Sequence, residues 1–217
     1  MIIQPKSKLL MIGDSITDCG RDRPIGEGLF SAYGNGYVSI IHGLLGSIIP
    51  EYQIRVMNMG ISGNTVRDLK SRWHTDVIDL KPDWLSIMIG INDVWRQFDS
   101  PLQTEWHVFP DEYEYTLDWL VTQTLPALKG LVLISPYFIE PNPDDPMRKM
   151  MDQYGLIVKM IASKHRCIFV DTQKAFNKVL EHIHPMTIAW DRVHPTISGH
   201  MVLAKAFLDA LEFPWKE

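Results

Sequence analysis

Residues 9–18 read LLMIGDSITD, and the change from apolar to polar residues within this stretch decides the expected fold. The short apolar run, ended by glycine, predicts a strand over residues 8–12 that is buried on both faces. The turn that follows presents a single hydroxyl, that of Ser15. A serine at that point can be a nucleophile, part of a phosphate-binding loop or the N-cap of the next helix. The stretch by itself leaves all three interpretations open.

The same pattern recurs along the chain, because short apolar runs alternate with segments of helical periodicity. Strands buried on both faces and separated by helices are typical of a parallel sheet covered on both sides. The sequence therefore predicts a three-layer α/β/α sandwich with a five-stranded parallel sheet. The further strands are expected at 54–59, 84–89, 131–135 and 167–170, and the helices at 36–49, 64–73, 111–128, 146–164, 172–181 and 197–211. Residues 91–110 are expected to form a long irregular connection.

Composition limits the classes of function. The 217 residues are 46% hydrophobic and 22% charged, with a net charge of −5, which indicates one domain over residues 1–217. The absence of a basic run argues against nucleic acid as a partner. No apolar stretch reaches the ~18 residues of a membrane helix, and the N-terminal residues do not resemble a signal peptide. We therefore expect a cytoplasmic protein with no membrane partner.

Polar, glycine-containing turns follow the first three predicted strands, at 13–15, 60–64 and 90–93. The carboxyl ends of parallel strands meet at one edge of a sheet, so these turns should converge on one site. Acyl transfer by a serine requires hydrogen-bond donors that face the developing oxyanion. The N–H of Ser15, the N–H of Gly60 and the side-chain amide of Asn92 are the expected donors.

A serine nucleophile also needs a base, and two acid–histidine pairs near the C-terminus offer one. WDRVHP, residues 190–195, places Asp191 three positions before His194, a spacing that lets the carboxylate hold the imidazole Nδ1–H. EHIHP, residues 181–185, offers Glu181 and His184 at the same spacing. The second pair continues a helical pattern and resembles a helix end, where its histidine would face the helix dipole. Spacing alone leaves both pairs open.

Four motifs resemble the conserved blocks of the SGNH (GDSL) hydrolases, in the order found in that superfamily: GDSITD (13–18), NMGISGNT (58–65), GIND (90–93) and DRVHP (191–195). Longer stretches, among them GISGNTVRDLK, IMIGINDVWRQ and DPMRKMMDQYG, resemble the intracellular bacterial acetylxylan esterases. The resemblance implies one flavodoxin-like SGNH hydrolase domain without metal or cofactor. It also implies Ser15 as nucleophile, His194 as general base, Asp191 as the residue that orients it, and the three oxyanion donors named above.

The expected substrate is a small acylated carbohydrate. Aromatic residues near the predicted site suit stacking on a sugar ring, and the candidate substrate contacts are Asp14, Trp95, Tyr137 and Trp190. A general short-chain esterase or thioesterase is the alternative enzyme, and a non-catalytic flavodoxin-like binding module is the alternative outside enzymes. Aromatic residues between 95 and 109 also indicate a subunit contact, so a homo-oligomer is expected.

Overall fold

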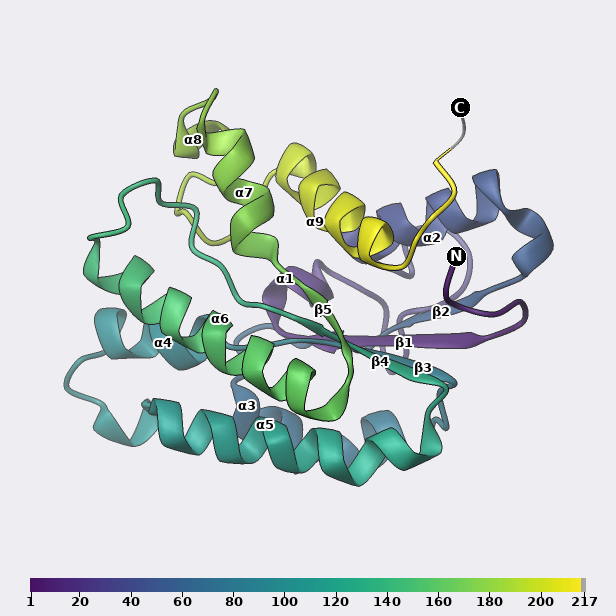
Figure 1. The fold of residues 1–217 in the computed structure, drawn as a ribbon, viewed down its shortest axis with the longest axis horizontal. Helices are drawn as coiled ribbons and strands as arrows, with labels where there is room; N and C mark the ends of the chain where they lie inside the picture. Colours follow the sequence, from purple (N-terminus) through teal and green to yellow (C-terminus); the bar gives the residue numbers. More distant parts are fainter. Residues whose placement is uncertain (216–217) are drawn as a thin grey trace.

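The computed structural model describes residues 1–215, and its centre is a five-stranded parallel sheet in the order β2-β1-β3-β4-β5 (Figure 1). The predicted α/β sandwich is confirmed, and its strand order is that of flavodoxin-like folds. The predicted domain extends to residue 217, so its last two residues lie outside the described part. The strands are β1 (Lys8–Gly13), β2 (Arg55–Asn58), β3 (Trp84–Met88), β4 (Gly130–Ile134) and β5 (Ile168–Val170).

The apolar runs form strands because both faces of the sheet are covered. All residues from Leu9 to Ile12 have no exposed surface, and every residue of β3 is buried. β1 pairs with β2 on one side and with β3 on the other, with Met11 opposite Asn58 and Ser86. Side chains on both faces of these strands are removed from water, which explains why the runs show no polar alternation.

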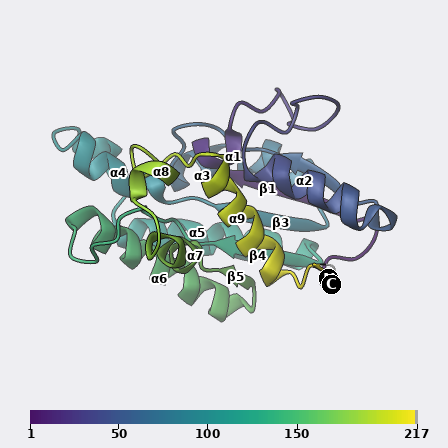
Figure 2. The ribbon, with the colours of Figure 1, turned by 90° about the horizontal axis from the view of Figure 1, so that it is seen from above.

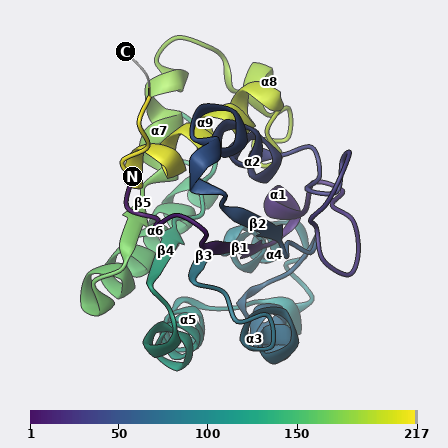
Figure 3. The ribbon, with the colours of Figure 1, turned by 90° about the vertical axis from the view of Figure 1, so that its right-hand side faces the viewer.

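Helices cover the sheet on two sides (Figure 3). One layer contains α2 and α9, which lie side by side in the view from above (Figure 2), together with α7. The opposite layer contains α3, α5 and α6. The helices are α1 (Ser15–Asp18), α2 (Tyr37–Ile48), α3 (Val66–Trp73), α4 (Ile91–Asp99), α5 (Pro110–Thr124), α6 (Pro146–His165), α7 (Thr172–Leu180), α8 (Pro185–Ile188) and α9 (Ile197–Ala210). Shorter turns of other helix types lie at Pro50–Tyr52, His74–Ile78, Thr104–Trp106 and Leu125–Ala127.

The prediction of a long irregular connection over 91–110 is wrong. Residues Ile91–Asp99 form α4, and a short 3-10 turn follows at Thr104–Trp106. Gly90 has a φ of 130°, which lets the chain turn directly from β3 into the helix. Ile91 and Val94 are buried one turn apart. Of the Trp and charged residues in this helix, Asp93 is buried as well, whereas Trp95, Arg96 and Asp99 are at least partly exposed.

The strand order places the candidate site. β2 lies on one side of β1, and the chain then crosses to form β3 on the other side. The direction in which strands are added to the sheet therefore reverses beside β1. Ligands of open parallel sheets bind outside the strands' carboxyl ends at this reversal. The turns after β1, β2 and β3 are the three that the sequence singled out. In residues 1–215 no helix has the length and apolar character needed to cross a membrane.

Candidate active site

Ser15 begins the short helix α1 directly after β1. The Asp14 carboxylate accepts the N–H of Ile16 at 2.9 Å and so caps this helix. Backbone N–H groups in the first turn of a helix have no partner within the helix and favour negative charge. Asp14 therefore supplies the cap, and the hydroxyl of Ser15 is left for other contacts.

The structure brings Ser15, His194 and Asp191 together, although the nearer partner in sequence, Asp191, lies 176 positions after the serine. The Ser15 Oγ lies 2.9 Å from Nε2 of His194, and Nδ1 of His194 lies 2.6 Å from Oδ2 of Asp191. The other carboxylate oxygen, Oδ1, accepts the backbone N–H groups of Val193 and His194 at 3.0 and 2.8 Å. Both oxygens of Asp191 are thus held by the loop that carries the histidine.

Electrostatics set the tautomer of His194. Partial burial acts to raise the pKa of Asp191, but the hydrogen bonds from the side chain and backbone of His194 and from Val193 outweigh it, so the pKa is below its usual range. An ionised carboxylate only accepts hydrogen bonds, so Nδ1 of His194 carries the proton. Nε2 is then free to accept the hydroxyl proton of Ser15.

The competing histidine does not reach Ser15. α7 ends at Leu180, and His184 is the N-cap of α8, where its Nδ1 accepts the N–H of Met186 at 3.3 Å. The expectation that His184 ends a helix and faces its C-terminal dipole is therefore wrong. The chain turns between the two helices, and the histidine begins the second one.

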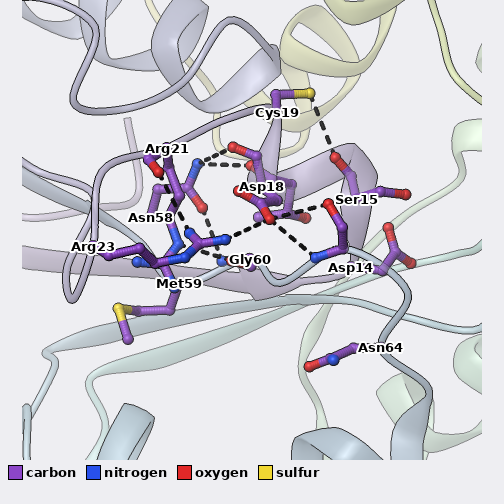
Figure 4. Close-up of polar contacts among 12 residues, drawn as sticks. Asp14, Ser15, Asp18, Cys19, Arg21, Arg23, Asn58, Met59, Gly60 and Asn64 are labelled. Atoms are coloured by element: carbon purple, nitrogen blue, oxygen red, sulfur yellow. Dashed lines mark hydrogen bonds and ion pairs between the residues drawn. The ribbon is translucent and has the colours of Figure 1, made fainter.

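The predicted oxyanion donors lie at the ends of β1, β2 and β3, but they differ in what else they bind. The N–H of Gly60 donates to Oδ1 of Asn58 at 2.9 Å, so this donor already has an acceptor (Figure 4). One hydrogen of the Asn92 amide goes to the carbonyl of Asn64 at 3.0 Å, which leaves the second hydrogen available. A Cβ at Gly60 would lie 2.2 Å from the backbone nitrogen of Asp18, so glycine is required here for the close approach of α1.

A model of the GDSL-like lipase/acylhydrolase family matches residues 11–202. The chain belongs to this family. An acetylxylan esterase of Geobacillus stearothermophilus is 60% identical over 215 residues, which are 99% of this chain and 98% of the relative. The crystal structure of Axe2, an acetylxylan esterase from the same organism, has a TM-score of 0.99 at 60% identity and covers 100% of this chain and 99% of its own. LAE5, an alpha/beta hydrolase enzyme from the metagenome of Lake Arreo, has a TM-score of 0.97 at 55% identity, with 98% of both chains covered. The resemblance stated from the sequence motifs is confirmed.

The four candidate substrate contacts of this GDSL-family chain occupy very different surroundings. Asp14 and Tyr137 are both buried, and the Tyr137 hydroxyl donates to the carbonyl of Val193 at 3.1 Å. Asp14 therefore supports α1 and Tyr137 supports the histidine loop, and their contact with a substrate stays a prediction. Trp95 packs beside His194, with 5.7 Å between the ring centroids. Trp190 is 78% exposed and adjoins Asp191, so it is open to a ligand.

Two polar residues that were not among the predicted site residues organise the site. The amide of Asn58 donates to the carbonyls of Thr17 and Tyr33, while its oxygen accepts the N–H of Gly60. Arg72, on α3, contacts the ends of β1 and β2. Asn58 was detectable as a polar residue that closes an apolar strand, whereas Arg72 resembled an ordinary surface arginine of an amphipathic helix.

Two buried carboxyl groups lie at this edge of the sheet. Burial raises the pKa of Asp14 to about 7, although the hydrogen bond from the N–H of Ile16 opposes the shift. Burial likewise raises the pKa of Asp93 to about 7, against the hydrogen bond that its Oδ1 accepts from Val66. Oδ2 of Asp93 is buried without a partner among the described residues. Ionising this carboxyl in the folded protein is therefore costly.

The raised pKa of Asp93 predicts a pH-dependent difference in stability between the wild type and Asp93→Asn. Between about pH 4 and pH 7 the folded state binds more protons at Asp93 than the unfolded state, so the free energy of unfolding falls as the pH rises. The asparagine variant lacks this titration. We therefore compare the free energies of unfolding of the two proteins by urea denaturation. The value for Asp93→Asn minus the value for the wild type should increase by more than about 1 kcal/mol from pH 5 to pH 8. A difference that does not change with pH would contradict the prediction.

Proposed function

We propose that this protein is a serine carboxylester hydrolase that removes acetyl groups from acetylated sugars, with xylo-oligosaccharides as the substrate class, through an acyl-enzyme. The observation that carries the proposal is the continuous chain of hydrogen bonds from Ser15 Oγ through His194 to Asp191. Membership of the GDSL family and the acetylxylan esterase activity named for the relatives support the ester and the sugar.

In the proposed first half-reaction, the Ser15 oxygen attacks the acetyl carbonyl while Nε2 of His194 takes the hydroxyl proton. Asp191 stabilises the imidazolium and keeps it oriented. The negative charge that develops on the carbonyl oxygen faces the N–H of Ser15 and the free hydrogen of the Asn92 amide. His194 then gives its proton to the departing sugar oxygen, and an acetyl-serine remains.

In the second half-reaction, water replaces the sugar. His194 removes a proton from the water, whose oxygen attacks the acetyl-serine carbonyl, and the same donors receive the oxyanion. The proton then passes to Ser15 Oγ as acetate leaves, which restores the free enzyme. The Gly60 N–H joins these donors only if a carbonyl oxygen competes with Asn58 Oδ1 for it.

The surroundings of His194 support a sugar as the alcohol part of the ester. Trp190 is exposed beside the triad acid, and Trp95 packs beside the histidine ring, so aromatic surface is close to where the leaving oxygen would lie. Aromatic faces stack on the apolar face of a sugar ring while its hydroxyl groups stay in water.

Relative rates of hydrolysis on three substrates distinguish this proposal from its alternatives. The enzyme should release acetate from acetylated xylobiose with a kcat/KM at least about tenfold above that for acetyl-CoA or p-nitrophenyl butyrate. A preference for acetyl-CoA would identify a thioesterase, and equal rates on all three would identify a general short-chain esterase. Failure to hydrolyse any of them would contradict the enzymatic function itself and favour a binding module.

A further inference from the structure

Arg72 lies beneath the candidate active site and is almost enclosed. Its side chain projects from α3 and is only 12% exposed. Four of its hydrogen bonds go to acceptors in the protein, which are Oδ1 of Asn64 at 2.7 Å, the carbonyl of Met59 at 2.8 Å, the carbonyl of Gly13 at 3.1 Å and the carboxylate of Asp76 at 2.6 Å. A planar guanidinium presents its donors in a fixed fork, so these acceptors are held in one geometry.

The bond to Met59 bears directly on the second oxyanion donor. The carbonyl of Met59 and the N–H of Gly60 belong to the same peptide unit, which is planar. When Arg72 holds this carbonyl, it also sets the direction in which the Gly60 N–H points. Arg21 donates a hydrogen bond to the next carbonyl, that of Gly60, at 2.8 Å. The peptide units before and after Gly60 are therefore both held by an arginine.

The contacts of Arg72 with Asn64 and Gly13 concern the other two oxyanion donors, the Asn92 amide and the Ser15 N–H. Asn64 accepts from Arg72 through its side-chain oxygen and from the Asn92 amide through its backbone carbonyl. The orientation of the Asn92 amide thus depends on a residue that the guanidinium fixes. The Gly13 carbonyl closes β1 two residues before Ser15, so the same group also holds the strand end from which α1 begins.

The charge of Arg72 is retained in this enclosed position. Burial lowers its pKa, and the ion pair with Asp76 acts in the opposite direction. Arginine remains protonated in proteins at neutral pH even when burial is unfavourable. The positive charge is therefore present beneath the site, and its hydrogen bonds to carbonyl oxygens are of the stronger, charge-assisted kind.

We propose that Arg72 is a positioning residue for the oxyanion hole. One guanidinium joins the strand ends and turns that carry the Ser15 N–H, the Gly60 N–H and the Asn92 amide, and so holds these three groups in fixed positions relative to one another. The proposal rests on the esterase function proposed above. It assigns no contact between Arg72 and the substrate, so its effect is expected on transition-state stabilisation and not on ground-state binding.

The test compares Arg72→Met and Arg72→Lys with Arg67→Met on p-nitrophenyl acetate. Arg67 is a matched control because it lies on the same helix and also forms an ion pair, but with Glu112 on the outer surface. Arg72→Met should lower kcat by about 10- to 100-fold, below the 10²–10³ that loss of a whole oxyanion donor costs. Its KM should change by less than about threefold, Arg72→Lys should be intermediate, and Arg67→Met should resemble the wild type.

A second readout separates positioning from general destabilisation. A small alkylboronic acid forms a tetrahedral adduct with a nucleophilic serine, and its oxygen would occupy the oxyanion hole. Arg72→Met should weaken inhibition by this boronic acid by about the same factor as it lowers kcat. Loss of kcat with unchanged boronate inhibition would overturn the proposal, and so would a kcat within about threefold of the wild type.

Asn64→Ala removes the hydrogen bond between Arg72 and the Asn64 side chain without removing a buried charge. This variant also tests the proposal if Arg72→Met does not fold. It should lower kcat by about 3- to 10-fold, and the double variant with Arg72→Met should lose less than the product of the two single effects. Independent, multiplicative effects, or an Asn64→Ala variant with full kcat, would overturn the proposal. A wild type that hydrolyses no ester would instead refute the proposed function, on which this inference depends.

Discussion

Replacing Ser15 by alanine is expected to lower kcat for acetate esters by on the order of 10⁴ to 10⁶. The variant keeps the fold, since Ser15 is partly exposed and the cap of α1 is provided by Asp14. What it loses is the atom 2.9 Å from the histidine, and without it no acyl-enzyme can form. Hydrolysis of p-nitrophenyl acetate under saturating conditions measures the effect.

Ser71→Ala provides the control for this prediction. Ser71 is exposed on α3 and donates only to the carbonyl of Asp68, so its loss should leave kcat unchanged. A fluorophosphonate probe should label the wild type and Ser71→Ala at Ser15, as mass spectrometry of the modified peptide can show, and should leave Ser15→Ala unlabelled. If Ser15→Ala retained the activity of the wild type, the proposed mechanism would be refuted.

His194→Ala is expected to lower kcat nearly as much as Ser15→Ala, by on the order of 10⁴ or more, because both residues act in the same proton transfer. The double variant should therefore be scarcely less active than either single variant. His184→Ala is the matched control, since it removes a histidine of the competing motif that only caps α8. It should cost some stability of that short helix and almost no activity, as rates and thermal unfolding measured on the same preparations would reveal. The reverse pattern would assign the base to His184.

The strands and most helices could be predicted because each depends on a local pattern. Apolar runs of strand length, ended by glycine or polar residues, marked β1, β2 and β3 within about two residues. The helix α4 could not be predicted in this way. Its richness in tryptophan and charge resembled a loop, and only the packing of α4 against α6 shows that Ile91 and Val94 are buried. The formation of α4 therefore depends on the burial of a few positions and not on the overall composition of the segment.

The family, the α/β sandwich and the strand ends that form the candidate site could all be predicted before folding was considered. These follow from motif order and hydrophobic pattern, which are properties of neighbouring residues. The two acid–histidine motifs have the same spacing, and it takes the folded chain to show that His194 contacts Ser15 while His184 caps α8. The tertiary structure alone showed Tyr137 turned inward and Arg72 joined to Met59 and Gly13. Such contacts depend on side-chain direction and on segments brought together across the sheet, and no local pattern encodes them.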